Sequence, residues 1–347
     1  MTELRAMERA LALALRGWGR VAPNPLVGAV LLRDGIVVGE GFHAEFGGPH
    51  AEVAALAACP EPAGTTCVVN LDPCTHFGKT PPCVDALIVA KVRRVVIALP
   101  DPNPVSAGGA DALRRAGIAV DLGVAKEAAA ALNAPFLWSV RRPERPFVAL
   151  KIATSADGFM TDGSGRPQWI SGPEARDYVH GLRAGFDAIG VGRLTAETDD
   201  PQLTVRGPLV PRVPPSRVVF TRSGVRADLD VIRTAGEVPT IVVTGPGRQP
   251  GIGEAQVIVA EGLKDSLVKL RAKGIRSLLI EGGATLAQAL LEDALVDRLY
   301  AIRAPSPLGS GKGVNLDRAK SWAVTERRTL GGDTLLVMDR ELCLQGL

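Results

Sequence analysis

The chain has 347 residues, of which 46% are hydrophobic and only 4% are aromatic. This length exceeds that of a typical single core and predicts two domains of α/β type. The formal net charge of +3 is small and gives no reason to expect nucleic acid as a partner. Because Glu3, Arg5, Glu8 and Arg9 are charged, we expect this N-terminal stretch to be neither a signal peptide nor a membrane span.

The first half of the chain alternates between helical and strand patterns. A helix capped by Thr2 is expected to bury Leu4, Met7, Leu11 and Leu15 on one side. Two strands follow at 27–32 and 36–41, joined by a hairpin turn at 33–35. We expect further strands at 66–71, 94–99 and 118–122, and helices at 49–59, 82–92, 110–116 and 126–138. Five strands with helices between them predict an α/β layered sheet.

Residues 43–83 contain three of the four histidines and four of the five cysteines. His50, Cys74 and Cys83 offer one imidazole and two thiolates, the ligand set of a catalytic zinc that keeps its fourth position for water. Glu52 stands where a carboxylate can carry a proton from that water to the leaving group. Pro49 and Pro82 are expected in the first turns of two helices, which would put metal ligands at helix N-termini.

Two other interpretations of this cluster stay open. His76 could close the site as the fourth ligand of a structural zinc, or the cysteines could be small buried residues. If two cysteines bind metal, Cys59, Cys67 and Cys343 are free thiols, which fits a reducing cytoplasm.

The second half begins after residues 141–146, where two prolines among four charges indicate an exposed, stiff linker. We therefore expect one domain at 1–145 and another at 146–347. Strands are expected from Phe147 and at 187–191, 218–221, 240–243, 257–260, 277–280, 297–303 and 335–339, with a helix at 173–184.

Two turns in this half follow buried strands and precede helices, at 190–195 and 281–285, so their free amides could bind phosphate. The first turn has Thr195 in place of the third glycine of the dinucleotide fingerprint, which argues against an ordinary Rossmann domain.

The first half contains four separated motifs. They are Ala22-Pro23-Asn24-Pro25-x-Val27-Gly28, Gly41-Phe42-His43, Pro49-His50-Ala51-Glu52 and Pro73-Cys74-x-His76-x-Gly78-Lys79-Thr80-Pro81-Pro82-Cys83. On these motifs, the first half resembles the deaminase half of the bifunctional riboflavin-biosynthesis deaminase/reductase. The resemblance implies that the aminopyrimidine and its ribose phosphate are held by Asn24, His43, His76, Lys79 and Thr80.

The second half resembles the reductase half of the same family. The motifs are Lys151-x-Ala153-x-Ser155-x-Asp157-Gly158, Gln168-Trp169-Ile170-Ser171, Arg183, Asp199-Asp200-Pro201-x-Leu203-Thr204-Val205-Arg206 and Glu281-Gly282-Gly283-x-Thr285-Leu286. The resemblance implies NADPH near Lys151, Ala153, Thr154, Trp169, Thr195, Asp199, Gly283, Ala284, Thr285 and Leu286. It implies substrate near Pro167, Arg183, Leu203, Arg206 and Glu281.

The implied fold is a cytidine-deaminase-like α/β/α zinc domain with a five-stranded mixed sheet, followed by a dihydrofolate-reductase-like α/β domain. The implied reactions are zinc-dependent deamination of 2,5-diamino-6-ribosylamino-4(3H)-pyrimidinone 5′-phosphate and NADPH-dependent reduction of the ribosyl group to a ribityl chain. We expect Zn²⁺ and NADPH as cofactors, a small phosphorylated pyrimidine as partner, no nucleic acid and no membrane, and a cytoplasmic homo-oligomer. The alternatives are a zinc deaminase of another base or nucleoside with a non-catalytic second domain, and a zinc-stabilised scaffold protein.

Overall fold

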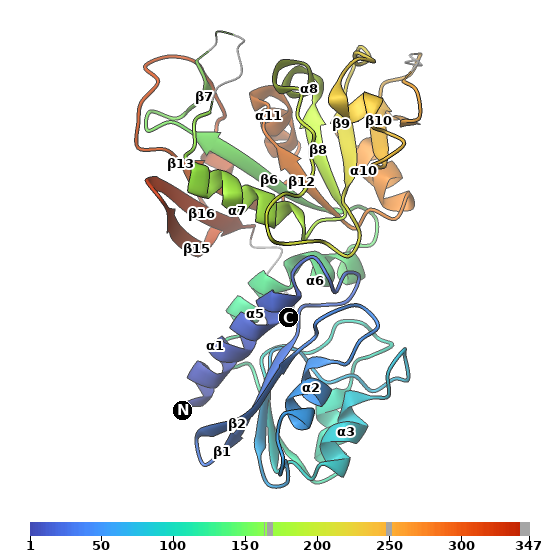
Figure 1. The fold of residues 1–347 in the computed structure, drawn as a ribbon, viewed down its shortest axis with the longest axis vertical. Helices are drawn as coiled ribbons and strands as arrows, with labels where there is room; N and C mark the ends of the chain where they lie inside the picture. The colour runs from blue at the N-terminus through green and yellow to red at the C-terminus, as the bar shows by residue number, and fades with distance from the viewer. Residues whose placement is uncertain (163, 165–168, 248–251, 341–347) are drawn as a thin grey trace. The chain divides into compact units, whose positions relative to one another are not determined.

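The structure is a computed structural model that describes residues 1–162, 164, 169–247 and 252–340. Contacts between residues divide the chain into two units, Met1–Arg141 and a second unit that begins at Arg142 (Figure 1). Among the described residues, no helix is long and apolar enough to cross a membrane.

The first unit is built on a five-stranded sheet in the order β2-β1-β3-β4-β5. Its strands are β1 (Gly28–Arg33), β2 (Ile36–Phe42), β3 (Thr66–Val69), β4 (Arg94–Ile97) and β5 (Ala119–Leu122). β1 pairs antiparallel with β2 and β3, whereas β3, β4 and β5 are parallel. The predicted five-stranded mixed sheet is thus confirmed.

Helices cover both faces of this sheet because side chains alternate along each strand. Val30, Val68 and Val96 pack on the side of α1 (Glu3–Ala14), α5 (Lys126–Leu132) and α6 (Ala134–Arg141). Leu31 and Ile97 face α2 (Ala51–Ala57), α3 (Cys83–Val89) and α4 (Gly109–Arg115) on the other side. This three-layer arrangement is the expected α/β/α fold (Figure 1).

The predicted buried side of the first helix is partly wrong. Thr2 does cap α1, since its hydroxyl accepts from the Arg5 amide at 3.4 Å, and a short 3₁₀ turn (Leu15–Gly17) follows the helix. However, Leu4 is 53% exposed and Leu15 is 50% exposed. The buried residues are Ala6, Met7, Ala10, Leu13 and Ala14. Small residues face the sheet because α1 lies so close that a Cβ on Gly28 would stand 2.0 Å from the Ala10 carbonyl oxygen.

The helix predicted at 126–138 is two helices, α5 and α6, separated by Asn133. The buried Asn133 amide accepts from the Leu26 amide nitrogen at 2.8 Å and donates to the Leu26 carbonyl oxygen at 2.9 Å. An asparagine side chain that forms hydrogen bonds with the backbone of another segment disfavours a continuous helix, which explains the break at Asn133.

The second unit is built on a nine-stranded sheet in the order β11-β10-β9-β8-β12-β6-β13-β16-β15. Its strands are β6 (Phe147–Thr154), β8 (Ala188–Gly192), β9 (Ser216–Phe220), β10 (Thr240–Thr244), β11 (Gln256–Val259), β12 (Ser277–Glu281), β13 (Arg298–Arg303), β15 (Ala323–Leu330) and β16 (Asp333–Asp339). Neighbouring strands from β11 to β13 are parallel, and β16 and β15 are antiparallel additions at one edge.

Two layers of helices complete this unit. Leu150 and Leu278 pack on the side of α10 (Leu263–Ala272) and α11 (Ala284–Glu292). Ile189 and Val219 pack on the opposite side with α8 (Arg193–Asp199) and α9 (Asp230–Arg233). The remaining elements are α7 (Pro173–Arg183), the two-stranded sheet of β7 (Phe159–Thr161) and β14 (Lys312–Gly313), and a 3₁₀ turn (Asp317–Ala319).

The sequence did not reveal β15, because this edge strand is mostly exposed and shows no alternation of apolar residues. The linker is also shorter than expected. Arg145 forms an ion pair with the buried Asp297 at 2.7 Å, and Pro146 is buried, so the end of the predicted linker is held against the second unit. The domain limits at 1–145 and 146–347 stay a prediction.

Candidate active site

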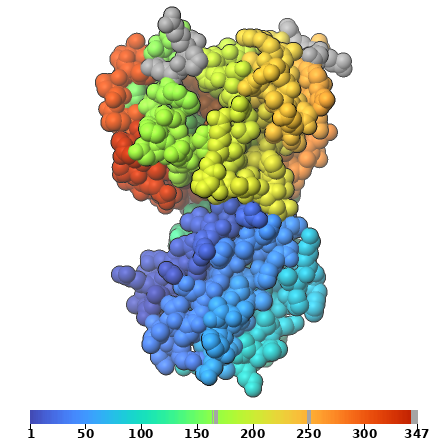
Figure 2. All heavy atoms as spheres, viewed as in Figure 1, coloured from blue at the N-terminus to red at the C-terminus, as the bar shows by residue number. Residues whose placement is uncertain are grey.

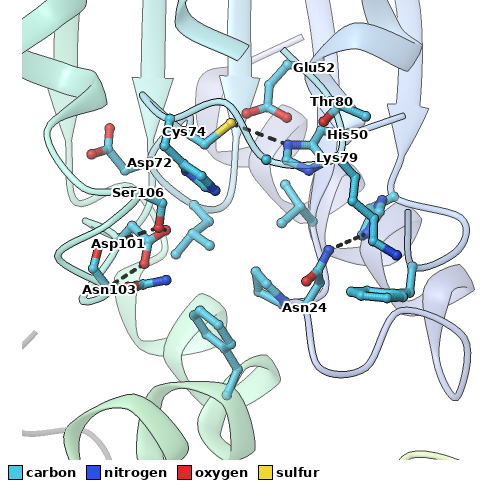
Figure 3. A pocket seen from close by; sticks show the side chains of 18 of the residues that line it. Asn24, His50, Glu52, Asp72, Cys74, Lys79, Thr80, Asp101, Asn103 and Ser106 are labelled. Atoms are coloured by element: carbon cyan, nitrogen blue, oxygen red, sulfur yellow. Dashed lines mark hydrogen bonds between the residues drawn. The ribbon is translucent and has the colours of Figure 1, made fainter. Parts of the chain in front are cut away.

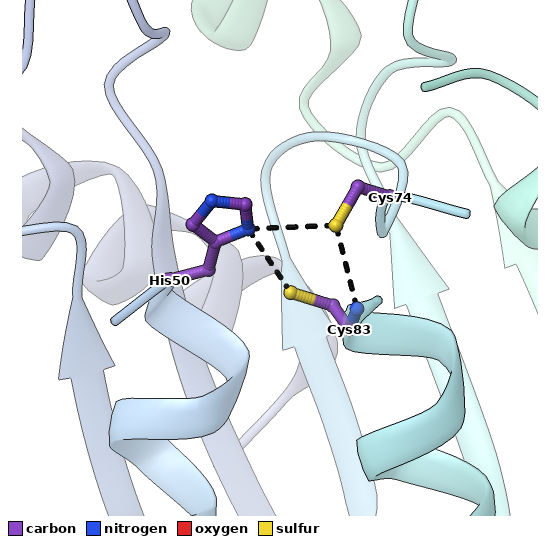
Figure 4. Close-up of side chains that lie close together, drawn as sticks. All are labelled: His50, Cys74 and Cys83. Atoms are coloured by element: carbon purple, nitrogen blue, oxygen red, sulfur yellow. Dashed lines mark hydrogen bonds between the residues drawn. The ribbon is translucent and has the colours of Figure 1, made fainter. Parts of the chain in front are cut away.

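The three predicted metal ligands lie together in the first unit (Figure 4). His50 caps the start of α2, Cys83 is the first residue of α3, and Cys74 follows β3. His50 Nδ1 lies 3.2 Å from Cys83 Sγ and 3.5 Å from Cys74 Sγ, and all three donor atoms lie within 4.8 Å of one another. Donors of a tetrahedral zinc stand about 3.5–3.8 Å apart, so this set fits the metal.

The helix N-termini contribute to the site as expected, although the two prolines do not stand in the first turns. Pro49 precedes the cap residue His50, and Pro82 is itself the cap of α3. The free amide of Cys83 donates to Cys74 Sγ at 3.3 Å. A hydrogen bond with the Cys83 side chain, together with His50, lowers the pKa of Cys74 to about 4. The same contact raises the pKa of Cys83, so it favours the thiolate form of Cys74 over that of Cys83.

Glu52 stands in the first turn of α2 and is only 3% exposed. Burial is the main cause that raises the pKa of this carboxyl to about 7. Glu52 lines the same cavity as His50 and Cys74, as Figure 3 shows. A carboxyl that exchanges its proton near neutral pH suits a proton carrier.

All five residues predicted to bind the deaminase substrate line this cavity, which has a volume of about 250 Å³. Asn24 and His43 form one part of the wall, with 3.1 Å between Asn24 Nδ2 and His43 Nε2. His43 Nδ1 lies 3.0 Å from the Pro49 carbonyl oxygen, to which it must donate. His43 Nε2 is therefore the acceptor, and Asn24 Oδ1 is not engaged by this contact.

His76, Lys79 and Thr80 line the cavity from the loop before α3. The Lys79 ammonium lies 4.2 Å from the centre of the Phe46 ring, an arrangement that holds the charge over an aromatic face. Nδ1 of His76 is buried and has no hydrogen-bond partner among the described residues. His76 also lies outside the group of possible metal ligands, so the described residues give no support to its role as a fourth ligand.

One wall of the cavity was not predicted from the sequence. It is formed by Asp72, Asp101, Asn103 and Ser106. Figure 3 shows Asp101, Asn103 and Ser106 on the side opposite Asn24 and Lys79. Ser106 Oγ donates to Asp101 at 2.6 Å, and the Asp72 carboxylate accepts from the first amides of α4. Because β3 and β4 are parallel, the loops that follow the two strands meet at the same edge of the sheet. This strand order is what could have indicated that the loop after β4 lines the cavity.

In the second unit, several of the predicted reductase residues lie near the ends of β6 and β12. Lys151 on β6 is directly opposite Glu281 on β12 in the parallel pairing. Arg183, at the end of α7, donates to the two carboxylate oxygens of Glu281 at 2.5 and 2.9 Å. Burial lowers the pKa of Lys151. Burial acts to raise the pKa of Glu281, but the charge and the hydrogen bonds of Arg183 outweigh it, so the pKa of Glu281 is lowered. The Arg183–Glu281 pair was not foreseen from the sequence.

The two predicted phosphate-binding turns face each other. Gly283 caps α11 with a φ of 81°, and a Cβ at this position would stand 2.7 Å from Thr195 Oγ1. Only glycine therefore allows this close approach. Ala284, Thr285 and Leu286 form the first turn of α11, and Thr195 and Asp199 lie on α8. Ala153 and Thr154 end β6.

Three further predicted contacts have distinct surroundings. Trp169 is 79% exposed, with the Arg176 guanidinium 4.8 Å from the centre of its ring. Leu203 is only 2% exposed and packs in the core, so only its backbone is available to a substrate. Arg206 is exposed and donates to Gln202 at 2.7 Å. Pro167 and Cys343 lie outside the described residues.

Two family models match the chain. The RibD C-terminal domain matches residues 146–336, and the cytidine and deoxycytidylate deaminase zinc-binding region matches residues 1–99. Together they cover most of both units, which confirms the expected deaminase-like and reductase-like halves.

Curated relatives resemble the chain along most of its length. Riboflavin biosynthesis protein RibD of Aquifex aeolicus is 40% identical over 319 residues, which are 89% of this chain and 88% of that protein. The protein of the same name from Escherichia coli is 41% identical over 323 residues and 88% of each chain.

Solved structures agree with the observed fold. RibD of Acinetobacter baumannii aligns with a TM-score of 0.82 at 36% identity, over 97% of this chain and 98% of that chain. A structure from Thermotoga maritima aligns with a TM-score of 0.84 at 34% identity, with the same coverage. That protein is described as a diaminohydroxyphosphoribosylaminopyrimidine deaminase/5-amino-6-(5-phosphoribosylamino)uracil reductase.

Proposed function

The chain belongs to the RibD family of bifunctional deaminases and reductases of riboflavin biosynthesis, and we propose which of its residues carry out the two reactions. Its first half is a zinc-binding deaminase domain and its second half is an NADPH-dependent reductase domain. The observation that carries the residue assignment is the cavity that places Glu52, His50 and Cys74 among all five predicted substrate residues.

In the deaminase site, His50, Cys74 and Cys83 hold the zinc. Zinc supplies an activated water at neutral pH, because it lowers the pKa of water that it binds. Glu52 accepts the proton of the attacking water and delivers it to the amino nitrogen, so that ammonia leaves. The buried position of Glu52 supports this role, since bulk water cannot easily take its place.

The other residues of the cavity orient the diaminopyrimidinone ribosyl phosphate. Lys79 is the cation for the phosphate. Asn24 meets the edge of the base, because His43 takes one of its N–H groups and leaves the amide oxygen as an acceptor. His76 adds an unpartnered ring nitrogen to the same wall.

In the reductase site, NADPH supplies the hydride that converts the ribosyl group to a ribityl chain. The facing turns at Thr195 and Gly283 hold its pyrophosphate with free helix amides. Arg206 is the exposed cation for the substrate phosphate. Arg183 shapes this site through Glu281, because the carboxylate engages two of its nitrogens.

The test is an assay of the purified protein with the diaminopyrimidinone ribosyl phosphate, in which ammonia release and NADPH consumption are followed separately. We expect ammonia first and NADPH oxidation only after it. Oxidation of NADPH without prior ammonia release would contradict the proposed order, and ammonia release without any oxidation would favour a deaminase with a non-catalytic second domain.

Two further proposals concern the setting of the enzyme. A cytoplasmic location agrees with the unpaired thiols of Cys59 and Cys67, which persist in a reducing compartment. Self-association stays a prediction, and light scattering of the purified protein measures it.

A further inference from the structure

His180 is the single histidine of the second half, and neither the sequence motifs nor the predicted site residues include it. It lies on α7, three residues before Arg183, so both side chains project from the same face of the helix. In Figure 2, α7 is green and lies beside the yellow-green segment 200–215, which follows α8.

The Arg183 guanidinium is almost fully engaged. Its Nε and Nη2 donate to the two oxygens of Glu281. Its Nη1 donates to the Thr204 carbonyl oxygen at 2.8 Å and lies 3.2 Å from His180 Nδ1. Arg183 therefore connects α7, the end of β12 and the segment around Leu203. The side chains of Arg183 and Glu281 are only 12% and 11% exposed, so water cannot readily replace these partners.

The contact with Arg183 fixes the protonation of His180. A guanidinium nitrogen can only donate, so His180 Nδ1 must accept, and the ring must be neutral with its proton on Nε2. Burial, Arg183 and Arg206 lower the pKa of His180, while Glu281 and a backbone contact at Thr204 oppose them. The charged groups that act on the ring are Arg183 on α7, Arg206 on the segment after α8 and Glu281 on β12.

We propose that His180 is a positioning residue of the reductase site, which acts as the neutral acceptor that holds Arg183 in place against Glu281 and Thr204. The inference rests on the proposed function of this site. Loss of the acceptor leaves one Nη1–H without a partner in a place that is mostly shielded from water. Arg183 then loses its fixed orientation, and both Glu281 and the segment that carries Arg206 lose an anchor.

The test compares His180→Ala with His180→Asn, because the Asn oxygen can accept near the position of Nδ1 and cannot be protonated. At pH 8 we expect His180→Ala to raise the KM and the Kd for the deaminated phosphorylated pyrimidine about tenfold, with a smaller change in kcat. His180→Asn should restore most of the loss. Ammonia release by the deaminase half is the internal control and should not change in either variant.

The pH profile separates this role from a merely structural one. Since the pKa of His180 lies below its ordinary value, the wild-type ring gains a proton only as the pH falls through that lowered pKa. His180 then loses its acceptor and repels Arg183, so the wild-type KM should rise relative to that of His180→Asn as the pH is lowered. The ratio of the two KM values removes the titration of the substrate phosphate, whose second pKa of about 6 affects both proteins equally.

Three results would overturn the proposal. They are an unchanged Kd for His180→Ala, no rescue by His180→Asn, and a wild-type KM that improves relative to His180→Asn at low pH, which would mean a direct contact of the imidazolium with phosphate. If His180→Ala does not fold, the comparison of the wild type with His180→Asn still decides. A wild-type protein that binds the pyrimidine but does not oxidise NADPH would count against the proposed function, while the Kd comparison would still test His180.

Discussion

Replacement of Glu52 by Gln is the sharpest test of the deaminase site. Gln has nearly the same volume and can still form hydrogen bonds, but it cannot carry a proton. A positioned acid or base contributes about 10²–10⁴-fold to a rate. Two other carboxylates line the cavity, but Asp72 is bound to the first amides of α4 and Asp101 to Ser106, so neither is free to take over.

Because Glu52 is also buried, we expect a loss near the upper end of that range, about 10³–10⁴-fold in kcat, or about 4–5.5 kcal/mol in the barrier. The measurement is ammonia release by protein whose zinc content is determined by atomic emission. The ligands His50, Cys74 and Cys83 are intact, so zinc should stay bound, and NADPH oxidation with the deaminated pyrimidine should be unchanged. A zinc-loaded variant that keeps more than a tenth of the wild-type rate would refute the role of Glu52.

Three further outcomes are expected. Asp339→Asn removes the negative charge that compensates the buried Arg298, which should lower the free energy of unfolding of the second unit by about 3–5 kcal/mol in a urea titration. Asp228→Asn, in an exposed pair, should cause no measurable change. Asn133→Ala removes the acceptor of the buried Leu26 amide, which should lower the free energy of unfolding by about 1–3 kcal/mol and raise the deaminase KM. An unchanged KM would mean that the loop carrying Leu26 needs no such anchor. Removal of zinc by a chelator should stop ammonia release and leave NADPH oxidation with the deaminated pyrimidine intact, and a parallel loss of both activities would contradict separate sites.

The zinc site could be predicted from the sequence because the chemistry of the ligands restricts the residue types. An imidazole, two thiolates and a nearby carboxylate are a rare combination, and His50, Glu52, Cys74 and Cys83 stand within a short stretch of chain. Most strands could be predicted because they are buried on both faces, and a short run of apolar residues between turn residues is a local pattern. The same local reasoning failed for α1, where the short distance to the sheet favours alanines over leucines at the contact.

The amino-acid sequence by itself predicted the cluster of His50, Cys74 and Cys83, the two strand–turn–helix connections and the two α/β halves, since each depends on neighbouring residues or on a short spacing. Only the tertiary structure decided that Arg183 binds Glu281, that Asn133 interrupts a helix to hold Leu26, and that the loop from Asp101 to Ser106 forms a wall of the deaminase cavity. These contacts join residues far apart in the chain. Their partners are set by the order of strands in each sheet, and no local pattern encodes that order.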